Sequence, residues 1–129
     1  KAGAAANFDA AYNLDPSFDD VASYAAAGRF LTGRPDEGRA ILLESFGTTT
    51  VDADVLLYAY YDAKLFTEAL AILTLRAEKG GALESYQLAL GYNEAGRKAE
   101  ARALTEATLK KYPGSVDIAT QVRAEIERP

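Results

Sequence analysis

Apolar residues recur at spacings of three and four along almost the whole chain, and chain breakers interrupt them at regular intervals. This pattern predicts a series of short helices and no strand. Gly and Pro separate the runs, because Gly accepts the left-handed geometry of a helix end and Pro cannot continue a helix. The expected helices span residues 1–14, 18–32, 35–46, 51–63, 66–79, 82–95, 98–111 and 115–127.

Three helix starts carry a hydroxyl residue that suits an N-cap, namely Ser17, Thr50 and Ser115. Each is followed two or three residues later by an Asp, whose charge suits the positive end of the helix dipole. These residues are therefore predicted to cap their helices.

Three segments, 19–49, 50–81 and 82–115, superimpose in sequence as helix pairs, which indicates an internal repeat. Their shared positions hold small or large apolar residues that let two helices pack closely. In the last two segments these residues are Leu56, Leu57, Tyr60, Phe66 and Ala69, and Leu88, Ala89, Tyr92, Ala101 and Leu104. This pattern resembles the tetratricopeptide (TPR) repeat, although the motif's usual Trp is missing.

The resemblance implies an all-α fold, a right-handed α-solenoid of about eight short antiparallel helices. An unrelated antiparallel helical array is the alternative. One domain, 1–129, is expected, made of a partial repeat 1–17, helix pairs 18–49, 50–81 and 82–114, and a capping helix 115–129. Residues 14–20 and 59–62, with Phe46 and Gly47, also resemble the soluble TPR regions of bacterial O-antigen ligase/polymerase-like membrane proteins. That likeness, with the lack of Cys, favours an extracytoplasmic location.

TPR proteins bind partners on the concave face formed by their first helices, so the resemblance implies a groove there. The helical period selects its residues: Tyr24, Phe30, Asp54, Tyr58, Tyr61, Asp62, Tyr86, Gln87, Asn93 and Glu94. No Lys or Arg is among them, so a clamp for a peptide carboxylate is not expected. Tyr and acidic side chains favour a protein partner with apolar and basic groups. For each Tyr, packing between helices is an equal alternative.

The charge and composition argue against several classes of function. Nineteen acidic against 14 basic residues give a net charge of −5, which disfavours nucleic-acid binding. The chain contains no Cys and no His, which removes thiol and imidazole catalysis and the usual zinc sites. On one helix Asp54 and Asp62 would lie roughly 12 Å apart, too far for a paired acid and base. We expect no enzyme, no cofactor, no metal and no membrane insertion in this segment.

The two ends of the predicted array differ. The first helix is apolar or small nearly all round, with Ala4, Phe8 and Tyr12 among its side chains, whereas the last has one narrow stripe. That stripe includes Ile118, Val122 and Ile126. Two functions follow: a scaffold that binds a protein or peptide in the groove, or a subunit that assembles head to tail into an extracellular filament. Removal from a longer protein would also explain the first helix.

Overall fold

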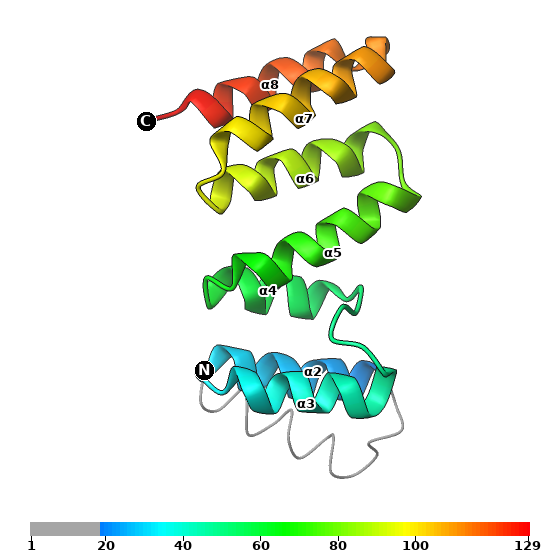
Figure 1. Ribbon diagram of the computed structural model, residues 1–129, viewed down its shortest axis with the longest axis vertical. Coiled ribbons are helices and arrows are strands. Elements are labelled where there is room, and N and C mark those ends of the chain that lie inside the picture. Colours follow the sequence, from blue (N-terminus) through cyan, green and yellow to red (C-terminus); the bar gives the residue numbers. More distant parts are fainter. Residues whose placement is uncertain (1–18) are drawn as a thin grey trace. The chain divides into compact units, whose positions relative to one another are not determined.

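The computed structural model describes residues 19–129, and the regular structure within that range is helical (Figure 1). Neighbouring helices are antiparallel and pack mostly in chain order, so the fold is all-α. The seven α-helices of this range are α2 (Asp19–Leu31), α3 (Pro35–Phe46), α4 (Asp54–Asp62), α5 (Phe66–Lys79), α6 (Ala82–Glu94), α7 (Lys98–Lys111) and α8 (Val116–Glu127). A short 3-10 turn, η1 (Pro113–Ser115), precedes α8.

The predicted helix limits are confirmed to within one residue for every described helix except α4. The predicted helix 1–14 and the cap Ser17 lie outside the described residues. Helix α4 begins at Asp54 after an extended Ala53, so the prediction that Thr50 caps it is wrong. The Thr50 N–H instead donates to Thr48 Oγ1 at 3.1 Å within the loop. Ser115 does precede α8, but its side chain forms no capping bond.

One left-handed turn occurs three times within residues 19–129, where it joins α2 to α3, α4 to α5 and α6 to α7. Gly33, Lys64 and Gly96 occupy its centre with φ angles of 75°, 59° and 79°. In each turn the next N–H donates at 2.8 Å to the carbonyl five residues earlier, the closing bond of a Schellman cap. These bonds join Arg34 to Arg29, Leu65 to Tyr60 and Arg97 to Tyr92. The helix pairs therefore share one connection, including the pair whose turn has no Gly.

The chain divides into two compact units, residues 1–69 and 70–129, with the boundary inside α5. In the first unit α2 packs against both α3 and α4 (Figure 1). Alanines on α2 are completely buried and permit this close approach. The rings of Phe30 and Tyr60 meet edge to face, 4.8 Å apart, and Gly38 of α3 leaves room for the Phe30 ring. This aromatic pair joins α2, α3 and α4.

In the second unit α6, α7 and α8 pack against one another (Figure 1). Their shared core consists of Tyr86, Ala89, Ala101, Ala119, Val122 and Ile126. Two threonines of α7, Thr105 and Thr108, are also buried. Their hydroxyls donate to the carbonyls of Ala101 and Leu104, one turn earlier, at 2.8 and 2.7 Å. Carbonyl groups of α7 therefore accept the hydrogen bonds of both hydroxyls. Because these hydrogen bonds are made within the helix, the two threonines can be buried in an apolar core.

Candidate docking surfaces

The outward face of α4 centres on Tyr58, whose side chain is 77% exposed. At 100° per residue, Asp54, Tyr58 and Asp62 fall within about 80° of arc on the helix surface. Both aspartates are exposed, while Leu56, Ala59 and Tyr60 on the other side of α4 are buried. Three of the predicted groove residues therefore form one exposed stripe, an aromatic ring with a carboxylate one turn before it and one turn after it.

Two further predicted groove residues belong to the same unit. Tyr61 is half-buried beside the stripe, and its ring lies 6.3 Å from that of Phe66 in an edge-on contact. Tyr24 is 45% exposed on α2, the helix that packs against α4. Both keep part of their surface accessible, and the contact with Phe66 orients Tyr61.

The structure corrects the prediction for Phe30 and Tyr86. Phe30 is only 2% exposed because its ring fills the space between Tyr60 and Gly38. Tyr86 is 1% exposed because α8 packs over its side of α6. Neither side chain can line a groove. For Tyr86 the alternative of packing between helices is the correct one.

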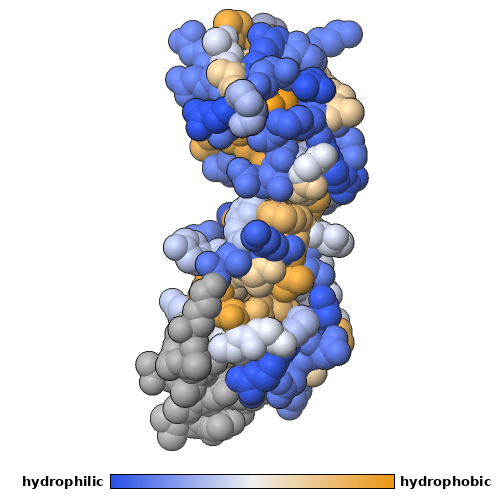
Figure 2. Space-filling model, turned by 90° about the vertical axis from the view of Figure 1, so that its left-hand side faces the viewer, coloured by the Kyte–Doolittle hydropathy of each residue, from blue (hydrophilic) through white to orange (hydrophobic). Residues whose placement is uncertain are grey.

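The groove residues predicted on α6 lie in the second unit. Gln87 is exposed, and Asn93 and Glu94 border an open depression of about 320 Å³ at the C-terminal ends of α6 and α8. Its other lining residues are Lys98, Glu125, Arg128 and Pro129. Basic groups therefore do stand beside the predicted groove residues, which spacing along α6 did not reveal. On the face drawn in Figure 2, hydrophilic residues predominate over α6 to α8.

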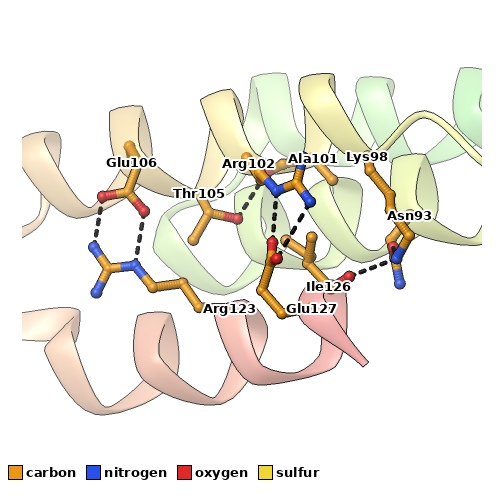
Figure 3. Close-up of polar contacts among 9 residues, drawn as sticks. All are labelled: Asn93, Lys98, Ala101, Arg102, Thr105, Glu106, Arg123, Ile126 and Glu127. Carbon is orange, nitrogen blue, oxygen red and sulfur yellow. Dashed lines mark hydrogen bonds and ion pairs between the residues drawn. The ribbon is translucent and has the colours of Figure 1, made fainter. Parts of the chain in front are cut away.

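The basic groups of this depression are already engaged. Lys98 Nζ donates to the carbonyl oxygen of Ile126 at 2.5 Å and to Asn93 Oδ1 at 3.0 Å (Figure 3). Arg128 pairs with Glu125 at 3.1 Å. A cation at the first residue of α7 is unfavourable for that helix, but here it meets the negative C-terminal end of α8. Lys98 therefore joins the start of α7 to the end of α8. The basic and acidic side chains that line the depression balance one another in charge.

Two exposed ion pairs join α7 to α8 (Figure 3). Arg123 binds both carboxylate oxygens of Glu106 at 2.7 and 2.5 Å, and Arg102 binds Glu127 at 2.5 and 3.2 Å. These hydrogen bonds hold the pKa of each carboxyl group below its usual range. Both pairs are bidentate, so they define the register of α8 on α7.

The residues predicted to form contacts between copies at the chain ends differ in their exposure. Val122 and Ile126 are buried against α6 and α7, so their proposed role in contacts between copies is wrong. Ile118 is 38% exposed and remains accessible. Ala4, Phe8 and Tyr12 lie outside the described residues. The apolar stripe of α8 serves mainly to attach this helix to its own unit.

Three features were not predicted from the sequence: the left-handed turn at Lys64, the buried hydroxyls of α7 and the contact of Lys98 with α8. None has a local signal, since each depends on a partner distant in the chain or on a backbone conformation unusual for its residue type. Among residues 19–129 no group of three or more His, Cys, Asp or Glu side chains is placed to hold a metal ion. No helix in this range is both long and apolar enough to cross a bilayer.

The chain was compared with protein-family models, with curated proteins and with solved structures, and none of the three comparisons finds a match.

Proposed function

We propose that this chain is a non-enzymatic protein-interaction scaffold of TPR type, whose helix pairs build a right-handed solenoid. The recurrence of one left-handed turn, centred on Gly33, Lys64 and Gly96, supports the repeat. The packing of α2 with α3 and α4, and of α6 with α7 and α8, agrees with successive helix pairs. Binding, rather than catalysis, is the function of such a surface.

The observation that carries the proposal is the exposure of Tyr58. Tyr supplies a large, rigid contact area at low entropic cost and is enriched at the centres of interfaces. Tyr58 stands at the middle of the exposed stripe of α4, while Tyr60 on the opposite side supplies the core. Because Tyr60 packs in the core and Tyr58 does not, the ring of Tyr58 is available to contact an external partner.

Site-specific photo-crosslinking in the cells that produce this protein tests the proposal. A photoreactive phenylalanine analogue replaces Tyr58 in one variant and Leu43, an exposed apolar residue of α3, in the control. We expect a discrete crosslinked adduct with a second protein from position 58 and none from position 43. The same adducts from both positions, or none from position 58, would overturn the proposal.

Self-assembly into a filament is the second candidate, and the observation that favours it is the exposure of Val116 and Ile118 on α8, at 51% and 38%. Apolar side chains at the end of a repeat array can form a contact with another copy. Light scattering against concentration tests this function. Growth of the mass with concentration, abolished by Ile118→Glu, would support the filament, and a constant mass would contradict it.

A further inference from the structure

An open groove lies between α6 and α7 in the second unit, with a volume of about 370 Å³. Pockets that hold a ligand or a large side chain have volumes of roughly 300–1,000 Å³. Leu88 in the groove is only 7% exposed, and Tyr92 and Leu104 are half-buried. The side chains that line the groove are mostly apolar: Leu88, Tyr92, Glu100, Ala103, Leu104 and Ala107.

The aromatic side chain of the groove is held in place from two sides. Tyr92 and Leu104 pack against the core of the second unit, so only part of each side chain is accessible. The guanidinium of Arg97 lies over the ring of Tyr92, 4.9 Å from its centroid, and donates to both oxygens of Glu100 at 2.6 and 2.5 Å. Aromatic residues in preformed pockets of this kind often dominate the binding energy of an interface.

Small side chains line the α7 side of the groove. Ala103 and Ala107 lie one turn apart on this helix, and both are exposed. Side chains of this size allow another helix to approach α7 closely. The groove therefore fits a helix that lies along α7 and places one large apolar side chain among Leu88, Tyr92 and Leu104.

The two ends of the groove differ in their available charge. At one end the carboxylate of Glu100 is already paired with Arg97. Beyond the other end, Lys110 lies on the same side of α7 as Ala103, seven residues earlier, and is exposed. No carboxylate of residues 19–129 pairs with Lys110. The groove therefore offers one available positive charge, which favours a partner with a carboxylate at this end.

We infer that the groove between α6 and α7 binds an acidic amphipathic helix of a protein partner, antiparallel to α7. A large apolar side chain of the partner fills the groove, and a carboxylate about two turns before it pairs with Lys110. This spacing follows from α7, where Leu104 and Lys110 are about 9 Å apart along the helix axis. In the antiparallel arrangement the carboxylate lies in the first turn of the partner helix, where it also stabilises that helix. The groove adds a second surface to the proposed scaffold and does not depend on Tyr58.

Three alanine-rich peptides, acetylated and amidated, test this inference on the full chain. Each has about 15 residues, a length at which an isolated helix begins to form in water. The first has Glu in its first turn and Phe two turns later, the second has Lys in place of Glu, and the third has Ala in place of Phe. Backbone amide NMR at low salt reports where each peptide binds. We expect the first peptide to shift the amides of residues 88–92 and 100–110. The second should bind at least roughly threefold more weakly, and the third should not bind detectably.

Variants of exposed α7 residues locate the site without disturbing the core. Ala103→Arg places a long side chain in the groove and should abolish binding of the first peptide. Lys110→Glu should reverse the order of the first two peptides, so that the Lys peptide binds more tightly than the Glu peptide. Lys111→Glu is the matched control, because Lys111 lies 100° further around α7, with its ammonium 5.5 Å from the centroid of the Tyr112 ring. This variant should leave the order unchanged. An unchanged circular dichroism spectrum shows that each variant is folded.

Several results would overturn the inference: no amide shift in the groove, no reversal by Lys110→Glu, or the same reversal by Lys111→Glu. Equal binding of the Phe and Ala peptides would also contradict it. Light scattering without peptide tests a different occupant, a second copy of the chain. A dimer that Ala103→Arg converts to a monomer would assign the groove to that second copy and reject the acidic helix.

The crosslinking experiment separates failure of this inference from failure of the proposed function. A specific adduct from position 58 without peptide binding in the groove would retain the scaffold and reject its second surface. Peptide binding without an adduct would retain the groove and reject the surface at Tyr58. Absence of both would reject both.

Discussion

The phenolic oxygen of Tyr86 on α6 lies 2.6 Å from Oγ of Ser115, at the start of α8. The Ser115 hydroxyl has one hydrogen, which it donates to the carbonyl of Tyr112 at 2.6 Å. Tyr86 is therefore the donor to Ser115. This chain of two hydrogen bonds explains why Ser115 does not cap α8 and why Tyr86, predicted to face a partner, instead joins α6 to the turn before α8.

Tyr86→Phe should lower the free energy of unfolding by about 1 kcal/mol, because it removes one partly buried hydrogen bond and leaves the ring in place. Urea denaturation followed by circular dichroism measures the change. Tyr58→Phe is the matched control, since it removes the same hydroxyl from an exposed ring and should have no effect. Equal stability of the two variants would show that the Tyr86 bond contributes nothing.

Gly38→Ala should destabilise the first unit, although Ala favours helix by about 1 kcal/mol over Gly. An added Cβ would lie 2.8 Å from the Phe30 ring, which Tyr60 contacts on another side. Overpacking of this kind costs about 1–3 kcal/mol, so we expect a net loss of roughly 1 kcal/mol. In a Phe30→Leu background the same change should become neutral or stabilising. A loss that persists there would mean that the ring is not the obstacle.

Lys64→Gly should stabilise the chain by about 0.5–1 kcal/mol, because a left-handed conformation strains residues with a side chain but not Gly. Lys64 has a φ of 59° in the turn where Gly33 and Gly96 occupy the equivalent positions. The reciprocal change Gly96→Lys should destabilise by a similar amount. Thermal unfolding of both variants checks the signs, and destabilisation by Lys64→Gly would contradict this assignment of strain.

Tyr60 should make the stability fall at alkaline pH. Burial, with a contribution from Glu68, raises the pKa of Tyr60 from 10.0 to about 12, while Arg39 acts in the opposite direction. The folded state therefore holds this proton more tightly than the unfolded chain does. The corresponding stability is complete below about pH 10 and is lost as pH rises through about 12, with roughly 1 kcal/mol lost near pH 11.

Tyr60→Phe removes this titration and serves as the comparison. Between about pH 9 and about pH 11 the unfolding free energy of the variant should fall less than that of the unchanged protein. Parallel pH profiles of the two proteins would refute the prediction, because the other tyrosines titrate in both.

The ion pairs between α7 and α8 should make the stability of the protein depend on pH in the acid range. Salt should weaken this dependence, because it screens the paired charges. Hydrogen bonds from Arg123 and Arg102 lower the pKa of Glu106 and Glu127 from the ordinary value of 4.5. Their stabilising effect is present above that value and is lost as pH falls through the lower folded-state pKa. The double variant Glu106→Gln with Glu127→Gln should show a flatter decline of the melting temperature below about pH 5. An identical decline, or one unaffected by salt, would show that these exposed pairs are inconsequential.

The helix series could be predicted from sequence because its information is local. Gly33, Gly47 and Gly96 mark helix ends where the backbone turns left-handed, and the apolar period identifies the segments between them. The exposed stripe of α4 was also predictable, since Asp54, Tyr58 and Asp62 recur at a spacing of four. At Thr50 the prediction failed, because a suitable cap residue does not itself start a helix.

The grouping of residues on each helix face and the helix limits, apart from those of α4, could therefore be predicted from the amino-acid sequence, because hydrogen bonds between residues close in the chain control both. Which helix faces are buried depends instead on the packing of the helices against one another. Helix α6 has neighbours on more than one side, so Tyr86 is buried by α8, and Phe30 is buried between Gly38 and Tyr60. Burial depends on which helices meet, and those contacts join residues far apart in the chain, where the helical period carries no information.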